Sequence, residues 1–509
     1  MKEKMNVLFI ISDQHRYDHM SCSGNKMLKT PNLDRLASEG VRFTNAFCTN
    51  PMCMPNRATL LTGLYPNVHG VRSNGMILSQ DVPTITQTLV DRGWHTAVFG
   101  KLHHQFNTAP YRIGDKSAES FYDWVFQKEG WYPVRENFPI PYYGYQEVET
   151  VIGHGACLTG HYLDWLEERS PRLAENMRKR WKNIDNFFSV FSEHELPVDL
   201  YSSAYVTERT TTFLERHANG DYGNKPFYVH CSFPDPHQSV YPPGKYRNLY
   251  KPEDVELPKN FKDLENLRKH PYLAPYINVM PGAMLRETNE EELRKFIAYT
   301  YGTVVLLDAS IGQILASLEK LGYADNTIVV YNSDHGDLMG EHGMLFKGPS
   351  AYMGVFRIPM IWRVPGITKP AVTDALMSSI DYPKTLLNLL GISKRKQPPD
   401  MQGFDMSAVL KDPENSANQP RDCCYIENDE EVGPLHERLR HLITKEFKLT
   451  IYEGHREYGD LFDRKNDLDE LNNLWYDEKY NGVKFELVNK LLHENLSAQT
   501  RYPKRIAGT

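Results

Sequence analysis

The hydrophobic residues of this chain fall into short continuous runs separated by helical stretches, a pattern typical of a buried parallel sheet covered by helices. The first run, at 6–11, is apolar and rich in β-branched residues, and the polar pair Asp13-Gln14 follows it closely. Further strands are predicted at 41–47, 95–99, 226–233, 327–331 and 355–362, and helices at 30–40, 53–63, 83–92, 200–217, 289–320 and 382–391. We therefore expect an α/β fold built on a large, mostly parallel sheet flanked by helices.

The pattern changes twice along the chain. Residues from about 105 to 200 are irregular, aromatic and charged, and we expect an insertion over a functional site, since long loops usually have a function. Short strands predicted at 439–444, 447–452 and 458–462, followed by an amphipathic helix at 483–497, indicate a smaller C-terminal antiparallel α+β domain. The expected division is a catalytic domain at 1–395, a linker at 396–420 and a C-terminal domain at 421–509.

Composition excludes several classes of protein. Of the 509 residues, 40% are hydrophobic and 24% charged, which excludes a disordered chain, a collagen and a coiled coil. The net charge of −7 argues against a nucleic-acid or anionic-membrane partner. The 7 cysteines include no CxxC pair, and we find neither a signal-peptide pattern nor a membrane-spanning apolar stretch. We expect a soluble cytoplasmic enzyme, although a chain whose leader had been removed would show the same pattern.

Polar residues follow four of the predicted strands, at the edge where ligands bind in open α/β sheets. They are Asp13 and Gln14, Lys101 and His103, His237, and Asp334 and His335. Any one of them alone is more often a helix cap or a structural group, but four strands ending this way favour a common site. Oxygen ligands with one imidazole suit Ca²⁺, Mg²⁺ or Mn²⁺ better than a structural zinc, and two unrelated strand-end turns remain the alternative.

Cys53 stands at the start of a predicted helix, whose free N–H groups favour an anion. An isolated cysteine is usually a buried structural group. Here Cys53 is followed by Pro55 and Arg57, and the helix ends in Thr62-Gly63. This run resembles the signature of the type I sulfatases of the alkaline phosphatase superfamily, which is Cys or Ser-x-Pro-x-Arg before a short helix ending in Thr-Gly.

The resemblance extends over nearly the whole chain except the insertion. Blocks similar to those of the sulfatases occur at 30–43, 100–103, 334–342, 346–348 and 459–463. The resemblance implies an alkaline-phosphatase-like fold and hydrolysis of sulfate monoesters. It also implies that a formylglycine-generating maturase oxidises Cys53 to formylglycine, whose hydrated aldehyde attacks sulfur and afterwards releases sulfate, an exit that a thiol lacks.

The resemblance also implies a role for each candidate residue. One divalent metal, Ca²⁺ first with Mn²⁺ or Mg²⁺ as alternatives, is expected to be held by Asp13, Gln14, Cys53, Asp334 and His335. Cations are needed on the sulfate-ester oxygens, and the candidates are Arg57, Lys101 and Lys347.

The histidines are the candidate proton carriers. His237 is expected to protonate the leaving oxygen and also to bind substrate, and His103 to act as the base. Asn74 is expected to reach the substrate or Arg57, with a simple turn as the equal alternative. For His104, Asp337 and His342 we expect contacts with the site residues themselves, or purely structural roles.

Two departures from the sulfatase pattern leave alternatives open. Many sulfatases have two acids where this chain has Asp13-Gln14, and Asp-Asn where it has Asp334-His335; both changes resemble the phosphonate monoester hydrolase and choline sulfatase branch. Those phosphonate hydrolases commonly have Tyr and Thr at the positions of Lys101 and His103. We therefore expect sulfate monoesters as substrates, with a phosphonate monoester or phosphodiester hydrolase as the alternative.

A non-catalytic sulfoglycan-binding protein with unconverted Cys53 is the alternative from another class. The expected ligand is a small-molecule or saccharide sulfate ester, and a homo-oligomer stays open. Aromatic residues of the insertion either stack on that ligand or pack the insertion; they are Trp124, Trp131, Tyr142 and Tyr143.

Overall fold

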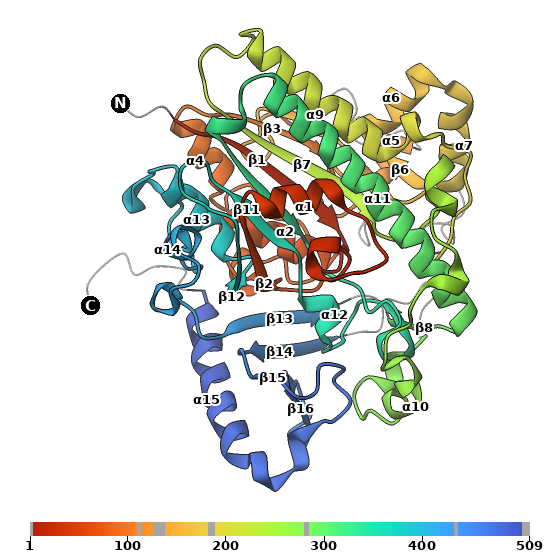
Figure 1. The fold of residues 1–509 in the computed structure, drawn as a ribbon, viewed down its shortest axis with the longest axis vertical. Helices are drawn as coiled ribbons and strands as arrows, with labels where there is room; N and C mark the ends of the chain where they lie inside the picture. Colours follow the sequence, from red (N-terminus) through yellow and green to blue (C-terminus); the bar gives the residue numbers. More distant parts are fainter. Residues whose placement is uncertain are drawn as a thin grey trace.

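The computed structural model describes residues 4–108, 115–125, 138–181, 189–278, 285–431 and 436–500. Its centre is an eight-stranded sheet with the strand order β12-β2-β11-β9-β1-β7-β3-β4 (Figure 1). Neighbouring strands are parallel except at β11, which runs antiparallel to β2 and β9. The strands are β1 Asn6–Asp13, β2 Val41–Phe47, β3 His95–Gly100, β4 Glu147–Thr150, β7 Phe227–Pro236, β9 Thr327–Ser333, β11 Met360–Arg363 and β12 Ala371–Ser378. The predicted large, mostly parallel sheet is confirmed.

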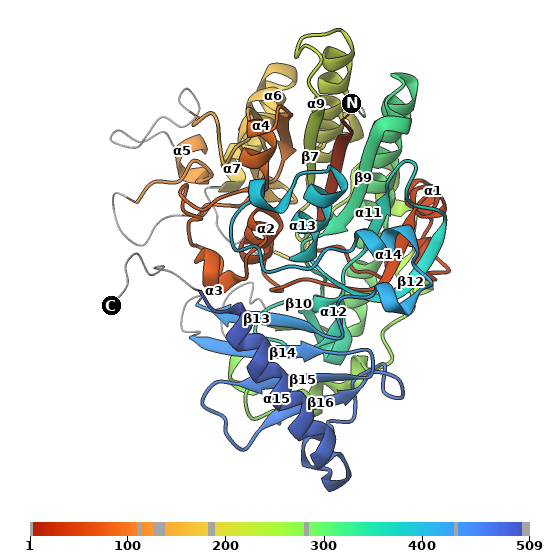
Figure 2. The ribbon, with the colours of Figure 1, turned by 90° about the vertical axis from the view of Figure 1, so that its left-hand side faces the viewer.

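Both faces of this sheet are covered by helices, as the continuous apolar runs require. In β1, Val7, Phe9 and Ile11 belong to one core, whereas Leu8 and Ile10 belong to the core on the other face. In Figure 2, α2 lies to one side of these strands and α1 and α11 to the other. The covering helices are α1 Pro31–Ser38, α2 Cys53–Thr62, α4 Ile85–Asp91, α9 Ser202–Ala218, α11 Glu290–Lys320 and α13 Asp381–Leu389.

The long helix α11 is apolar enough, by length and composition, to cross a membrane. However, 67% of its most apolar window is buried inside the fold. Leu307, Ile311 and Ile314 pack in the same core as Leu8 and Ile10 of β1. We therefore interpret α11 as a core helix of a globular protein.

A second, four-stranded antiparallel sheet with the order β13-β14-β15-β16 lies below the large sheet in Figure 1, with the helix α15 along it. Its elements are β13 Cys424–Glu430, β14 Glu437–Ile443, β15 Phe447–Tyr452, β16 Gly459–Asp463 and α15 Asn481–Ala498. Arg421, just before β13, makes two buried bonds to Asp381 of α13, at 2.6 and 3.0 Å. The expected C-terminal antiparallel α+β unit is therefore present and joined to the large sheet by a buried ion pair.

Three segments differ from the expectation. The predicted strand 355–362 is a short helix, α12 Met353–Phe356, followed by β11. The sequence did not predict the strand β13, because its polar stretch ENDE at 427–430 is typical of a loop. Every residue of this strand is nevertheless buried. The strand β4 lies inside the expected insertion, yet it pairs with β3, so this segment extends the large sheet.

The insertion aromatics within the described residues pack inside the fold. Trp124, Tyr142 and Tyr143 are 4%, 0% and 3% exposed. The Tyr143 hydroxyl donates to the carbonyl of Leu78 at 2.5 Å. Trp131 lies outside the described residues. The packing interpretation therefore holds for these three side chains.

Candidate active site

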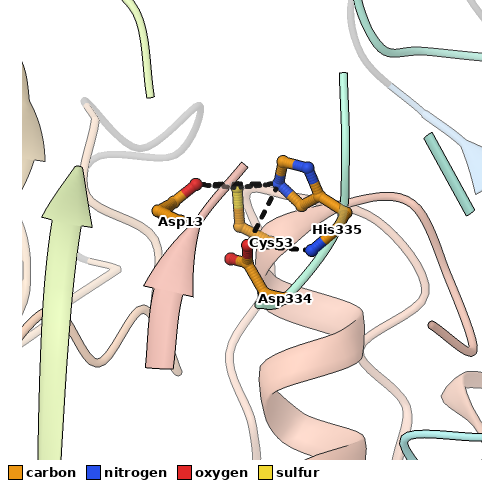
Figure 3. A group of neighbouring side chains, drawn as sticks. All are labelled: Asp13, Cys53, Asp334 and His335. Atoms are coloured by element: carbon orange, nitrogen blue, oxygen red, sulfur yellow. Dashed lines mark hydrogen bonds and ion pairs between the residues drawn. The ribbon is translucent and has the colours of Figure 1, made fainter. Parts of the chain in front are cut away.

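The carboxyl ends of β1 and β9 bring the first candidate ligands together. The strands pair in parallel with Ser12 opposite Ser333, so Asp13 and Asp334 emerge side by side. One ligand atom from each of four buried residues lies within 4.8 Å of all the others (Figure 3); the residues are Asp13, Cys53, Asp334 and His335. The structure thus brings together two strand ends and the start of α2.

Backbone and side-chain contacts fix the direction of each of these ligands. Asp334 Oδ2 accepts from Arg57 Nε at 2.8 Å, and its Oδ1 accepts from the Gln14 N–H at 3.0 Å. The carbonyl of Gly336 lies 2.8 Å from His335 Nδ1, so this nitrogen donates and Nε2 is turned toward the cluster. His335 Nε2 then lies 3.2 Å from the Cys53 sulfur.

The donor set fits a divalent cation. Two carboxylates, an imidazole nitrogen and the Cys53 sulfur converge on one point, and the amide oxygen of Gln14 contacts Lys347 beside it. Carboxylate and imidazole ligands suit a hard or borderline ion. The Lys347 ammonium lies among these donors, 2.8 Å from His335 Nε2 and 3.2 Å from Gln14 Oε1. The residues present therefore already bind positive charge at this point.

The carboxylates are kept ionised by surrounding cations. Burial and the Cys53 sulfur raise the pKa of Asp13, but Lys101, His237 and Arg57 outweigh them and hold it well below its ordinary value. Lys101 Nζ and Arg57 Nη2 both pair with Asp13 Oδ2, the latter at 3.2 Å. The carboxylate of Asp13 is therefore charged throughout the physiological pH range.

The same field acts on Cys53 at the start of α2. Burial raises the pKa of its thiol, but Lys347, Lys101 and His335 lower it well below its ordinary value. Lys347 Nζ lies 3.1 Å from the sulfur. The charges of Cys53 and two nearby carboxylates in turn raise the pKa of Lys347 despite its burial. Position 53 is thus built to stabilise negative charge on its side chain.

Two further histidines border this point. His237 follows β7, and its Nε2 lies 3.3 Å from Lys347 Nζ. The carbonyl of Gln238 lies 2.6 Å from His237 Nδ1, which orients the ring. Burial lowers the pKa of His103 to about 4, although its contact with Cys53 acts in the opposite direction. Both rings therefore sit within the cluster that contains Cys53.

The structure places Asn74 differently from the other candidates. Its Oδ1 accepts from the Met54 N–H at 3.1 Å, so it caps one of the free donors at the start of α2. No bond from Asn74 to Arg57 occurs among the described residues. Asn56, inside the signature, was not singled out, yet its Nδ2 donates to the Asp334 carbonyl at 2.6 Å and ties α2 to β9.

The three residues expected to contact the site residues or to have structural roles lie around this cluster. Gln14 Nε2 donates to Asp337, which also accepts from the Phe346 N–H at 3.0 Å, just before Lys347. His342 pairs with Asp263 at 2.7 Å, and His104 packs edge-on against Tyr143. Asp337 therefore connects a candidate ligand with the segment of a candidate cation.

Glu119 was missed by the sequence interpretation. Its buried carboxylate accepts from three consecutive backbone N–H groups, those of His103, His104 and Gln105, at 2.5, 2.9 and 3.2 Å. The Tyr142 hydroxyl donates to it at 2.8 Å. This carboxylate holds His103 in its left-handed conformation, with φ of 57°. No local pattern announces it, because it lies sixteen residues beyond His103.

We expect Glu119→Gln to lower kcat on a sulfate ester by about 10- to 100-fold, because a misplacement of about 1 Å has that effect. The new side-chain amide would direct an N–H group at the backbone N–H donors from which the Glu119 carboxylate now accepts. Glu149→Gln, which changes a half-buried acid on β4, serves as the matched control. A folded Glu119→Gln protein with full kcat would contradict this positioning role.

A solved structure shares this fold. A phosphonate monoester hydrolase of Agrobacterium radiobacter matches with a TM-score of 0.78 and 24% identity, over 98% of this chain and 97% of that chain. The metal-type donor set and the cysteine at the start of α2 lie at the carboxyl edge of this sheet.

The family follows from the sequence comparisons. The family model described as "Sulfatase" matches residues 5–392, and the chain belongs to this family. A second model, "N-sulphoglucosamine sulphohydrolase, C-terminal", matches residues 340–497. An N-acetylglucosamine-6-O-sulfatase of Bacteroides thetaiotaomicron is 25% identical over 96% of this chain and 86% of its own length. An arylsulfatase of Clostridium perfringens is 28% identical over 97% of this chain and 95% of its own length. The protein is thus a sulfuric ester hydrolase.

Proposed function

We propose that this enzyme hydrolyses sulfate monoesters of a small molecule or saccharide through a formylglycine at position 53 and one divalent cation. The convergence of Asp13, Cys53, Asp334 and His335 within 4.8 Å is the observation that carries this proposal. Ca²⁺ is the first candidate, and the imidazole of His335 keeps Mn²⁺ and Mg²⁺ open. A formylglycine-generating maturase is the partner that this chemistry requires.

The absent groups supply chemistry that the chain lacks. Asp13, Asp334, His335 and the amide oxygen of Gln14 would hold the cation, which would supply Lewis acidity to an oxygen at position 53. The formylglycine, when hydrated, supplies one hydroxyl to attack sulfur and a second to expel sulfate. The Cys53 sulfur marks the position of the oxygen that replaces it.

The remaining steps belong to the charged residues around position 53. Lys101 and Lys347 are the cations for the sulfate-ester oxygens, because both ammonium groups lie against the cluster. Arg57 binds both carboxylates and so fixes α2 against β1 and β9. These three groups stabilise the charge that develops as the ester bond breaks.

Proton transfer is assigned to the two histidines. His237 Nε2 and Lys347 Nζ share a contact of 3.3 Å, and together they hold the proton for the leaving oxygen. His103, whose lowered pKa of about 4 leaves it neutral at pH 7, is able to accept a proton beside position 53. Asn74 acts by fixing the start of α2, through the Met54 N–H, and so positions Cys53.

The alternative substrate is a phosphonate monoester or phosphodiester, supported by Gln14 and His335. Lys101 and His103 favour the sulfate ester. The test compares kcat/KM for a nitrophenyl sulfate with that for the matching phenyl phosphonate monoester, on enzyme with converted Cys53. We expect the sulfate to be preferred; a strong preference for the phosphonate would contradict the proposal.

A further inference from the structure

The strand β13 of the C-terminal sheet reaches the segments that carry the catalytic residues. Asn428 and Glu430 stand two residues apart on this strand, so their side chains emerge on the same face. Asn428 Nδ2 donates to the Gly348 carbonyl at 3.1 Å, directly after Lys347. This bond places the end of β13 beside the Lys347 segment.

Glu430 is joined to the segment beside Cys53. Its Oε1 accepts from the Ser73 hydroxyl at 3.2 Å. The next residue, Asn74, holds the Met54 N–H at 3.1 Å, one residue after Cys53. Asn428 therefore contacts the segment of Lys347, and Glu430 contacts the 73–74 segment, which in turn binds the start of α2 beside Cys53.

Each of these side chains has one acceptor oxygen with no partner among the described residues. Asn428 Oδ1 and Glu430 Oε2 are buried and make no hydrogen bond to any of the described residues. The donation to Gly348 fixes the orientation of the Asn428 amide, so the atom left over is the oxygen. Buried acceptors without donors cost free energy, and a pair of them on one strand face calls for donors from a ligand.

The acids on either side of Glu430 do have partners. Asp429 pairs with Arg440 at 2.5 Å, and Glu431 pairs with Arg72 at 2.5 Å. Burial raises the pKa of Glu430 to about 7, while Lys347 acts in the opposite direction. Of these three acids, Glu430 is therefore the one that makes no ion pair with another described residue.

The burial of Glu430 does not separate it from substrate, because the catalytic residues are equally enclosed. Glu430 and Asn428 are 0% exposed, Cys53 is 1% and Lys347 is 4% exposed. A substrate bound at Lys347 lies next to Gly348, whose carbonyl accepts from Asn428. The sulfate group of this substrate binds the cations, and its alcohol portion extends toward the neighbouring side chains.

We propose that Asn428 and Glu430 bind the alcohol portion of the substrate by accepting hydrogen bonds from hydroxyl groups beside the sulfate ester. This inference rests on the proposed function and narrows it to polyhydroxylated alcohols, that is, saccharide sulfates. A second sulfate at this point is disfavoured, because it would bring only acceptors and negative charge to Glu430. An aryl sulfate offers no donors there.

The test is the specificity ratio, defined as kcat/KM for the best sulfated monosaccharide of a panel divided by kcat/KM for nitrophenyl sulfate. Glu430→Gln keeps the shape and the acceptor for Ser73, but turns the free oxygen into a donor. We expect this ratio to fall by about 10- to 100-fold, because the saccharide hydroxyl would then meet an N–H donor in place of an acceptor. Glu431→Gln, the matched control at the next residue, should leave the ratio unchanged.

Deoxy analogues of the same saccharide sulfate identify the hydroxyl. For one analogue, kcat/KM with the wild-type enzyme should fall by the same factor that Glu430→Gln shows on the full saccharide. Glu430→Gln should lower kcat/KM for that analogue little further, because the two changes remove one interaction. Equal losses on saccharide and aryl esters, or an unchanged ratio in a folded variant, would overturn the assignment. A wild-type enzyme that cleaves neither ester would overturn the proposed function itself, and this inference with it.

Discussion

Replacement of Cys53 by alanine is expected to lower kcat on a sulfate ester by about 10⁴-fold or more, the effect of removing a covalent nucleophile. The sulfur of Cys53 lies within 3.2 Å of both His335 Nε2 and Lys347 Nζ, so no other described side chain occupies that point between the candidate metal ligands and the cations. The measurement is the rate of nitrophenyl sulfate hydrolysis at saturating substrate, with folding followed by thermal unfolding.

Cys48→Ala is the matched control for this variant. Cys48 is also fully buried, but its sulfur contacts the Val355 carbonyl at 3.7 Å and is not one of the four converging ligand atoms. We expect this control to lose stability without a comparable loss of kcat. A Cys53→Ala enzyme that keeps more than about a hundredth of the wild-type kcat would remove residue 53 from the role of nucleophile.

The second large effect is expected for Asp334→Asn. The change removes one of two carboxylates from the donor set and takes the charge from the partner of Arg57 Nε, at 2.8 Å. We expect the affinity for Ca²⁺ or Mn²⁺ to fall by at least about 100-fold, more than for an outer contact, and kcat/KM to fall with it. Calorimetric titration of the stripped protein with each metal measures this directly.

Asp308→Asn is the control, because Asp308 is a buried acid on α11 that accepts from the Leu33 N–H at 2.8 Å at the start of α1. This variant should unfold at a lower temperature and bind the metal as the wild type does. Equal metal affinity of Asp334→Asn and wild-type protein would exclude Asp334 from the ligands.

Sequence patterns predicted the parts of the fold that depend on local order. The apolar runs of β1 and β9 identify buried strands, and the polar residues that follow them, Asp13 and Asp334, meet at the predicted edge. The signature at 53–63 gave the start and end of α2. These features are readable because each element carries its own periodicity.

The missed features depend on partners distant in sequence. The β13 strand is polar along most of its length, and only its contacts with the Ser73 and Gly348 segments explain why Asn428 and Glu430 are buried. Glu119 acts through backbone groups sixteen residues away. A hydrophobicity pattern contains no information on such pairs, since burial of a polar group is decided by its bonding partner.

The most direct test of a formylglycine at position 53 is mass spectrometry of the peptide that contains Cys53, taken from a preparation that cleaves sulfate esters. We expect an aldehyde in place of the thiol at position 53, in a fraction of the molecules that rises in proportion to the sulfatase activity of the preparation. Cys48 in the same region should stay a thiol. An active preparation in which residue 53 is entirely unconverted cysteine would contradict the assignment.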